Sequence, residues 1–281
     1  MAKMLWKPSE QRIKNSHMYR FMNFVNNKYG KKFTEYAPLY EWSVQSISDF
    51  WAAMWEFANI KASKPYDQVV DNPDKMPGTK WFSGARLNFA ENLLRFRDNQ
   101  TALVFAGEDK VTRKVTYAEL YDEVARLAKP LKELGIKPGD RVVGFMPNMP
   151  ETIFAMLAAT SLGATWSSCS PDFGIKGVLD RFGQIKPRVL FTANGYWFKG
   201  KSLDSLDRIS DILKQLPSIE KVVVVPYTEK EPKISGVPKA VAYRDFRSSQ
   251  GNLSMEFVQL PFDHPLYIMY SSGTTGLPKC M

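Results

Sequence analysis

The stretch RVVGFMPNMPETIFAMLAATSLGATWSSCS, residues 141–170, decides the fold class of this chain. It opens with an apolar run rich in β-branched residues, which predicts a strand. Asn148 and Pro150 then give the start signals of a helix, and Gly163 gives its stop signal. The stretch closes on a second short run that predicts another strand. A strand, a helix and a strand in close succession predict a right-handed crossover between two parallel strands.

The same alternation continues on both sides of this stretch. Upstream, TALVFAG (101–107) predicts a strand, and Thr116 with Glu119 makes a capping box that opens a helix, which Gly135 closes. Repetition at this spacing predicts an α/β fold with a mostly parallel sheet and helices on both faces. The elements expected downstream are a helix at 177–186, a strand at 188–192, a helix at 203–216, a strand at 221–225 and a strand at 265–270.

The first hundred residues are rich in Trp, Tyr and Phe and less regular. Apolar residues at a spacing of three to four predict amphipathic helices at 19–30 and 43–60, and 81–94 is expected to end in a helix. Large aromatic side chains usually bury themselves, so we expect them to pack in a core rather than line a ligand site. The chain is therefore divided into an aromatic-rich helical extension, residues 1–100, and an α/β domain, residues 101–281.

Composition and charge limit the classes of function. The 281 residues are 44% hydrophobic and 24% charged, as in an ordinary globular protein. The formal net charge of +9 would suit a nucleotide or a nucleic acid, but the basic residues are scattered, with no run longer than a pair such as Lys31-Lys32. A solvated surface is the favoured interpretation, and we expect no nucleic-acid partner. The apolar runs are far shorter than a membrane span, so no membrane association is expected.

Cysteine and histidine usage gives further limits. Cys169 and Cys280 make neither a disulfide framework nor a metal quartet. The N-terminal residues show no apolar segment of a secretory signal, so a reducing, cytosolic (cytoplasmic) location is expected. His17 and His264 indicate neither a catalytic triad nor a metal site, and we expect both to be structural or solvated.

The segment SSGTTGLPK, residues 271–279, has the composition of an anion-binding loop. Glycines let backbone N–H groups converge on one anion, hydroxyls add donors, and a lysine adds a positive charge. The pattern differs from GxxxxGK[ST], because two residues including Pro278 separate the second glycine from the lysine. The alternative is a flexible linker, which the preceding apolar run disfavours. The predicted phosphate-binding residues are Ser271, Ser272, Gly273, Thr274, Thr275, Gly276 and Lys279.

This segment resembles the phosphate-binding signature of the adenylate-forming enzymes, the acyl-CoA synthetase and ligase superfamily. Residues 119–148 are similar to the early part of that fold, while 39–60 and 81–94 resemble the N-terminal extension of the acetyl-CoA synthetase branch. Within that branch, 163–191 and 260–281 are most similar to the ligases that activate acetoacetate. The resemblance covers essentially the whole chain, but only the N-terminal part of a family member.

The resemblance implies a ligase that works in two steps. A carboxylate attacks the α-phosphate of ATP and forms an acyl-adenylate and pyrophosphate, and the thiol of coenzyme A then displaces AMP. The implied substrates and cofactors are acetoacetate, ATP, Mg²⁺ and coenzyme A. The first step needs charge neutralisation and in-line positioning more than a side-chain base, because the acid is already an anion. By resemblance, Thr274 and Thr275 contact the β- and γ-phosphates and Lys279 screens their charge.

A second implied site is that of coenzyme A. In the acetyl-CoA synthetase branch, the turn that corresponds to residues 170–174 lies against the adenine of coenzyme A, and basic residues downstream bind its phosphates. The alternative for the two lysines in this region is that they are exposed loop residues. Trp166, nearby, is expected in the core rather than in a substrate wall. The implied residues are Ser170, Pro171, Asp172, Lys199 and Lys201, with Arg181 as a further candidate.

The family's remaining functional parts lie downstream of the phosphate loop, including its adenine-recognition segment, its magnesium-binding carboxylate and its catalytic lysine. We therefore expect no catalytic residue and no metal ligand among these residues, and an incomplete adenylation domain truncated at the phosphate loop. Two hypotheses stay open. The chain is either the N-terminal part of an acetoacetate–CoA ligase, which needs the missing C-terminal portion, or a non-catalytic module that binds a partner or a nucleotide weakly. A ligase for acetate, propionate or butyrate is a further alternative.

Overall fold

The structure is a computed structural model that describes residues 4–108, 111–271 and 276–281. The chain divides into two compact units, Met1–Arg86 with Pro261–Asp263, and Leu87–Leu260 with His264–Met281. Each unit has its own hydrophobic core. Among the described residues, no helix is both long and apolar enough to cross a bilayer.

The first unit packs short helices around aromatic side chains, as the sequence predicts. The ring of Phe21 lies 5.2 Å from that of Phe57 and 5.8 Å from that of Phe50, centroid to centroid. Val25 and Ala53 are fully buried in the same core. The elements of this unit are α1 (Glu10–Lys14), α2 (His17–Tyr29), α3 (Tyr36–Gln45), α4 (Ile47–Phe57), β1 (Gln68–Val70) and β2 (Trp81–Ser83), with β1 and β2 antiparallel.

The prediction of one helix over 43–60 is wrong, because the segment contains the end of α3 and all of α4. Ser46 separates them with φ −119° and ψ 57°, outside the helical region. Its N–H donates to the carbonyl of Trp42 at 2.8 Å, and its carbonyl accepts from the N–H of Phe50 at 2.9 Å. One residue therefore ends the first helix and begins the second, and the apolar spacing alone does not reveal this break.

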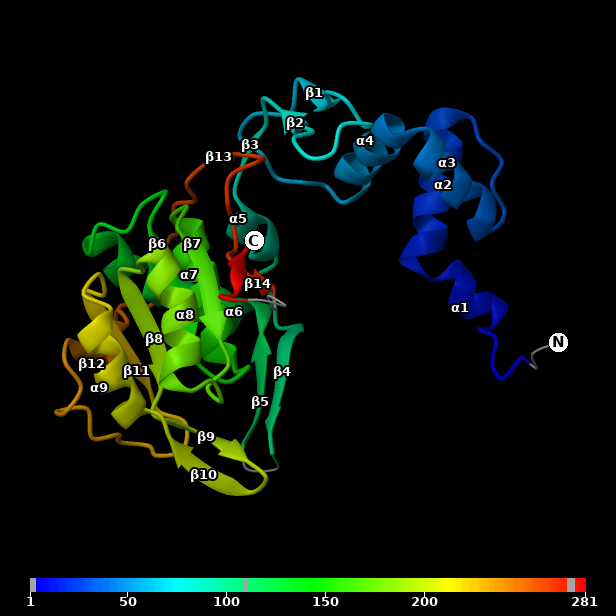
Figure 1. Cartoon of the computed structure of the whole chain (residues 1–281). Coiled ribbons are helices and arrows are strands. Elements are labelled where there is room, and N and C mark those ends of the chain that lie inside the picture. The colour runs from blue at the N-terminus through cyan, green and yellow to red at the C-terminus, as the bar shows by residue number, and fades with distance from the viewer. Residues whose placement is uncertain (1–3, 109–110, 272–275) are drawn as a thin grey trace. The chain divides into compact units, whose positions relative to one another are not determined.

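The second unit contains a five-stranded sheet with the strand order β12-β11-β8-β6-β7 (Figure 1). Every neighbouring pair in it is parallel, which confirms the predicted fold class. Beyond β7, Tyr267 makes one further parallel bridge to Trp166. The strands of this sheet are β6 (Arg141–Phe145), β7 (Thr165–Cys169), β8 (Val189–Ala193), β11 (Lys221–Val225) and β12 (Ala240–Ala242).

Helices cover both faces of this sheet. Adjacent residues of β6 point to opposite faces, so Val142 belongs to one core cluster and Val143 to the other. The chain passes from β6 to β7 over the first face and returns past β6 to β8 over the second, as crossovers of one hand require. The first face carries α6 (Tyr117–Glu133) and α7 (Pro150–Ser161), and the second carries α8 (Ile175–Ile185) and α9 (Leu206–Gln215).

The predicted start and end of α6 are confirmed. Thr116 and Glu119 form both hydrogen bonds of the capping box, and Gly135 follows the helix with φ 72°. The strand expected at 101–107 is present, but it pairs antiparallel with a second strand that the sequence pattern does not predict. The remaining elements are α5 (Phe89–Leu93), α10 (Tyr243–Phe246), β3 (Arg86–Leu87), β4 (Thr101–Gly107), β5 (Val111–Thr116), β9 (Gly195–Phe198), β10 (Lys201–Asp204), β13 (Leu260–Pro261), β14 (Tyr270–Ser271) and β15 (Lys279–Cys280).

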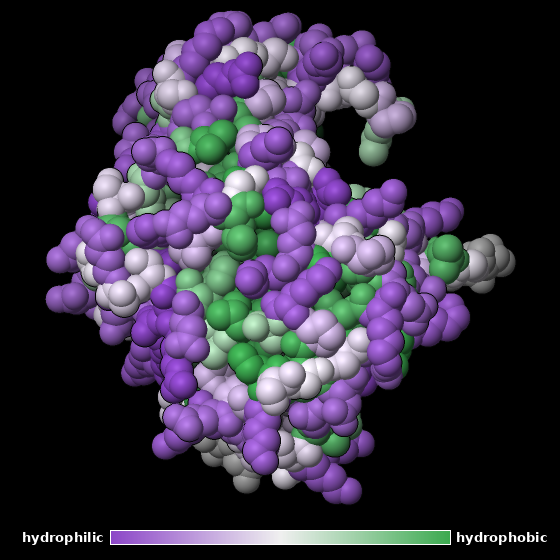
Figure 2. Space-filling model, turned by 90° about the vertical axis from the view of Figure 1, so that its left-hand side faces the viewer, coloured by the Kyte–Doolittle hydropathy of each residue, from purple (hydrophilic) through white to green (hydrophobic). Residues whose placement is uncertain are grey.

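The face shown in Figure 2 is dominated by hydrophilic side chains, with apolar ones in smaller patches between them. Two exposed hydrophobic residues of the second unit are Val104 on β4 and Met269 beside β14.

Candidate functional site

Three predicted binding segments leave the sheet at its carboxyl edge. β7 runs directly into the turn 170–174, and β8 is followed by the hairpin that contains Lys199 and Lys201. The segment around Tyr267 runs parallel to β7 and leads into β14 and the predicted phosphate loop. In open parallel sheets, ligands bind outside the carboxyl ends of the strands. The candidate site is therefore this edge of the second unit.

The turn 170–174 joins β7 to α8. The Phe173 N–H donates to the carbonyl of Ser170 at 3.2 Å, and Gly174 is the N-cap residue of α8. Ser170 and Asp172 are exposed, while Pro171 between them is buried. The turn thus presents two polar side chains to solvent from a rigid base.

Arg208 on α9 holds this turn through hydrogen bonds to its backbone carbonyls. Its Nη1 donates to the carbonyls of Pro171 at 2.9 Å and Phe173 at 3.2 Å, and its Nη2 donates to the carbonyl of Asp204 at 3.3 Å. Asp204 is the last residue of β10, so one guanidinium links the turn after β7 to the base of the β9–β10 hairpin. No motif in the sequence marks Arg208 for this role.

The two lysines predicted for coenzyme A lie at the tip of that hairpin. Lys199 and Gly200, with φ 51° and 75°, form its two-residue turn, and Lys201 opens β10. The carboxylate of Glu108 accepts hydrogen bonds from the N–H groups of Lys199 at 3.0 Å and Gly200 at 2.8 Å. Both lysine side chains are exposed, and within the described residues neither forms an ion pair or a hydrogen bond with the residues of the 170–174 turn.

The predicted phosphate loop is carried by a β-hairpin. Tyr270 and Ser271 of β14 pair with Cys280 and Lys279 of β15, so Ser271 lies opposite Lys279. Ser271 is half-buried and Lys279 is exposed. The prediction of a strand over 265–270 is correct only in part, because β14 begins at its last residue. Gly276 has φ 124°, where a side chain would be strained. Four predicted residues, Ser272, Gly273, Thr274 and Thr275, lie outside the described residues.

Two side chains, one on α8 and one on β7, contact this hairpin and the segment that leads into it. Gln184 on α8 donates from Nε2 to the carbonyl of Pro278 at 2.9 Å. Ser167 on β7 donates to the carbonyl of Ile268 at 2.8 Å, and its Oγ lies 3.4 Å from the Tyr270 hydroxyl. Burial raises the pKa of Tyr270 to about 12, so this hydroxyl stays protonated at neutral pH. Neither Gln184 nor Ser167 carries a sequence signal for this role.

Arg181 lies between two of the predicted segments. Its Cζ is 4.2 Å from the ring centroid of Phe173 in the turn and 5.6 Å from that of Tyr270 in β14. Its Nη1 donates to the carbonyl of Gly177, one turn earlier in α8. The sequence suggested Arg181 as a coenzyme A ligand, whereas the structure places it between aromatic rings.

Trp166 is a core residue, as expected. It is 4% exposed and belongs to the cluster on the α6 and α7 face. Gly144 on the neighbouring strand leaves room for its ring, since a Cβ at that position would lie 2.8 Å from Trp166 Cζ2. His264 is also structural, because its Nε2 lies 2.8 Å from the carbonyl of Gly163. His17 is exposed at the start of α2.

The described residues include no group of three or more His, Cys, Asp and Glu side chains that would hold a metal ion. Burial raises the pKa of the Cys169 thiol to about 12, so this thiol is protonated at neutral pH.

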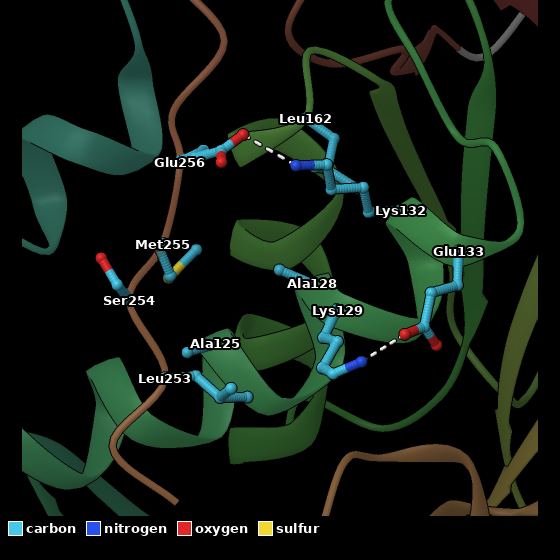
Figure 3. Close-up of a pocket in the computed structure, with 10 residues that line it drawn as sticks. All are labelled: Ala125, Ala128, Lys129, Lys132, Glu133, Leu162, Leu253, Ser254, Met255 and Glu256. Atoms are coloured by element: carbon cyan, nitrogen blue, oxygen red, sulfur yellow. Dashed lines mark hydrogen bonds and ion pairs between the residues drawn. The ribbon is translucent and has the colours of Figure 1, made fainter. Parts of the chain in front are cut away.

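A separate cavity of about 260 Å³ lies between α6 and the extended segment 253–256 (Figure 3). Its floor is apolar, and ion pairs of Lys132 with Glu256 at 2.7 Å and of Lys129 with Glu133 lie beside it. None of the predicted site residues lines it. The lining residues are Ala125, Ala128, Lys129, Lys132, Glu133, Leu162, Leu253, Ser254, Met255 and Glu256.

Comparison with protein families gives two matches. Residues 89–281 match the family described as AMP-binding enzyme, and residues 36–93 match the acetyl-coenzyme A synthetase N-terminus. The first match includes every predicted binding segment. The second covers most of the helical first unit.

Individual relatives agree with both matches. The chain is 45% identical to a Gallus gallus protein named acetoacetyl-CoA synthetase, over 100% of this chain and 43% of the relative. It is 44% identical to an acetoacetyl-coenzyme A synthetase of Rhizobium meliloti (strain 1021), over 99% and 42%. The solved structure of acetoacetyl-CoA synthetase from Streptomyces lividans superposes with a TM-score of 0.91 at 39% identity, over 99% of this chain and 43% of that one. The chain thus spans about two fifths of the length of these relatives.

Proposed function

Because this chain belongs to the AMP-binding enzyme family, we propose that it is the N-terminal part of a ligase that joins acetoacetate to coenzyme A at the expense of ATP. Residues 1–100 would be its extension of the acetyl-CoA synthetase type, and residues 101–281 the first part of its adenylation domain. The remaining part of the ligase would supply the catalytic lysine, the adenine-binding segment and the carboxylate for magnesium. This chain covers 43% of the Gallus gallus relative and 43% of the Streptomyces lividans chain, which supports the proposal that a further part of the ligase exists.

One observation supports the proposal most strongly: the three predicted binding segments all begin at the same edge of the sheet. The turn 170–174, the β9–β10 hairpin and the β14–β15 hairpin all follow strands that end at this edge. A ligase of this kind must bring the anionic acid, the triphosphate and the thiol together in line. Neighbouring strand ends provide such an arrangement on a rigid base.

In the proposed first step, the β14–β15 hairpin neutralises the triphosphate. The hydroxyls of Ser271 and Ser272, with Thr274 and Thr275, would donate hydrogen bonds to phosphate oxygens, and Lys279 would screen their charge. Gly273 and Gly276 have no side chain, so their backbone N–H groups would be able to approach the phosphate oxygens closely. Mg²⁺ would arrive with ATP and supply further charge neutralisation, held by groups outside the described residues.

In the proposed second step, coenzyme A approaches from the turn 170–174. Ser170, Pro171 and Asp172 would lie against its adenine ring, and Lys199 and Lys201 would face its phosphates. The exposure of both lysines and the fixed hairpin that carries them support this assignment. The cytosolic location expected from the cysteine usage stays a prediction of the sequence.

The acid specificity is tested by product analysis with the full-length protein that contains this chain. ATP, Mg²⁺ and coenzyme A are supplied with acetoacetate, acetate, propionate or butyrate, and the thioester formed is quantified by mass. We expect acetoacetyl-CoA to form with the largest kcat/KM. Equal or greater turnover of a plain fatty acid would overturn the choice of acid, and no thioester with any acid would favour the non-catalytic binding module.

A further inference from the structure

Arg181 has an unusual environment for a helix arginine. Its guanidinium contacts the ring of Phe173 on one side and faces the ring of Tyr270 on another, at 4.2 Å and 5.6 Å from the ring centroids. The two rings belong to segments almost a hundred residues apart in the chain. Arg181 is half-buried, so this contact is partly shielded from water.

Within the described residues, no carboxylate forms an ion pair with Arg181. Its guanidinium donates a hydrogen bond to the carbonyl of Gly177 in its own helix. The adjacent carboxylate of Asp180 is paired with Lys176 at 2.7 Å. The aromatic faces of Phe173 and Tyr270 are therefore its principal partners, and such faces attract a guanidinium.

Both rings are anchored to elements of the candidate site. The carbonyl of Phe173 accepts a hydrogen bond from Arg208, which holds the backbone that carries this ring. The hydroxyl of Tyr270 lies beside Ser167 on β7, and Ser271 follows directly as the first residue of the predicted phosphate loop. The guanidinium of Arg181 therefore lies near one anchored ring from each of the two segments.

We propose that Arg181 is a positioning residue that couples the turn after β7 to the entry of the phosphate loop. It holds Tyr270, and with it Ser271, at a position set by Phe173. This inference rests on the proposed function, because it assigns a nucleotide to the segment after Tyr270 and coenzyme A to the turn. Arginine suits this role better than lysine, since its flat guanidinium stacks on aromatic faces and a lysine ammonium does not.

The test is a double-mutant cycle on ATP affinity in the full-length protein. ATP binding is measured by calorimetry for the wild type, Phe173→Leu, Arg181→Met and the double variant. Phe173 lies in the turn assigned to coenzyme A and outside the predicted phosphate loop. The proposal therefore expects any effect of Phe173→Leu on ATP affinity to act through Arg181. We expect Phe173→Leu and Arg181→Met each to weaken ATP binding roughly three- to tenfold, as loss of one partly desolvated cation–π contact predicts. The double variant should be no weaker than Arg181→Met alone.

Two further variants separate coupling from general stability. Arg181→Lys keeps the charge and should lose most of the ATP affinity that Arg181→Met loses. Lys137→Met removes an exposed cation between α6 and β6, at the opposite edge of the sheet, and should leave ATP affinity unchanged. Additive effects of the two single variants, or a lowered melting temperature with unchanged ATP affinity, would overturn the coupling.

The outcome also separates this inference from the proposed function. If ATP affinity is lost non-additively in a protein that forms no thioester, the positioning role of Arg181 stands and the ligase function is wrong. Thioester formation with additive losses would keep the ligase and remove the positioning role. A wild-type protein that does not bind ATP would overturn both.

Discussion

Single side chains hold the predicted binding segments in place through hydrogen bonds to backbone carbonyls. Arg208 binds the carbonyls of the turn after β7, and Gln184 binds the carbonyl of Pro278. Such contacts join residues far apart in the chain, so periodicity and motifs do not predict them. The sequence does predict the loop residues themselves, because glycine, hydroxyl and lysine in that order have a direct chemical purpose. Ser271, Gly276 and Lys279 are within the described residues, and their roles stay predictions.

Lys279 gives the sharpest prediction for a single residue. In the full-length protein, Lys279→Ala should slow adenylate formation by roughly ten- to a thousandfold, as removal of one charged group from a developing anion does. It should slow thioester formation from preformed acyl-adenylate much less, because pyrophosphate is absent from that step. Single-turnover assays of the two half-reactions measure this difference.

The matched control for this variant is Lys137→Ala. Lys137 is an exposed lysine between α6 and β6, at the opposite edge of the sheet from the carboxyl-edge hairpins. It should leave both half-reactions unchanged. Equal slowing of the two half-reactions by Lys279→Ala would contradict a role on the triphosphate.

Gly144 gives a prediction about the core. A Cβ at this position would lie 2.8 Å from Trp166 Cζ2, so Gly144→Ala should force the ring to shift and lower the free energy of unfolding by about 1–3 kcal/mol. Gly236→Ala is the control, because a Cβ there meets no atom within 4 Å and Gly236 has no positive φ. Urea unfolding measures both. An unchanged midpoint for Gly144→Ala would show that Trp166 is less fixed than its burial indicates.

At the scale of elements, buried segments are predicted well and exposed ones poorly. The strands β6, β8 and β11 and the helix α6 lie within one or two residues of their expected bounds, because burial imposes a regular apolar pattern. The sequence does not predict β5 or the β9–β10 hairpin. Most residues of β5 and β10 are exposed, so these strands leave no regular apolar pattern. The single helix expected over 43–60 is divided at Ser46 by a local backbone turn, which apolar spacing does not report.

The β9–β10 hairpin carries a prediction for coenzyme A. Replacing both Lys199 and Lys201 by Ala should raise the KM for coenzyme A roughly tenfold or more, because each lysine that meets a phosphate contributes a charge-assisted contact. Pyrophosphate exchange with acetoacetate and ATP, which needs no coenzyme A, should be unchanged. Lys137→Ala with Lys214→Ala removes the same charge from exposed lysines at the opposite edge of the sheet and should change neither value. An unchanged KM for coenzyme A would show that Lys199 and Lys201 are exposed loop residues that do not bind coenzyme A.

Arg188 joins three elements at the opposite edge of the sheet. It contacts the carboxylates of Asp140 and Glu220, both at 2.8 Å, and the carbonyl of Leu134 at 3.1 Å. The hydrogen bond from Arg188 holds the pKa of Glu220 below its usual value. A depressed carboxyl pKa gives stability above the unfolded value, about 4.3, that is lost as the pH falls through the folded value.

Arg188→Met should therefore destabilise the protein most at neutral pH, and the difference from wild type should shrink below about pH 4.3. Urea midpoints at several pH values measure this. Lys214→Met removes an exposed lysine that pairs with Asp211 on α9, and its effect should be small at every pH. A difference that stays constant down to acid pH would assign the effect of Arg188 to packing rather than to its carboxylate partners.

At the scale of the whole molecule, the second unit places the predicted binding segments along one edge of a five-stranded parallel sheet. Its two apolar cores make that sheet a rigid base for them. The chain spans 43% of the Gallus gallus relative, and the groups that the proposed chemistry still needs are expected in the rest of the ligase. We therefore expect the 281-residue chain by itself to give no pyrophosphate exchange, and exchange by it would show that those groups are dispensable.

The most direct test of the central claim is acid-dependent exchange of labelled pyrophosphate into ATP by the full-length protein, without coenzyme A. This assay reports adenylate formation alone, the step to which the predicted phosphate loop belongs. The account predicts exchange that requires acetoacetate and Mg²⁺ and is slowed roughly ten- to a thousandfold in Lys279→Ala. No exchange by the wild type in the presence of acetoacetate, or exchange that does not depend on an acid, would contradict it.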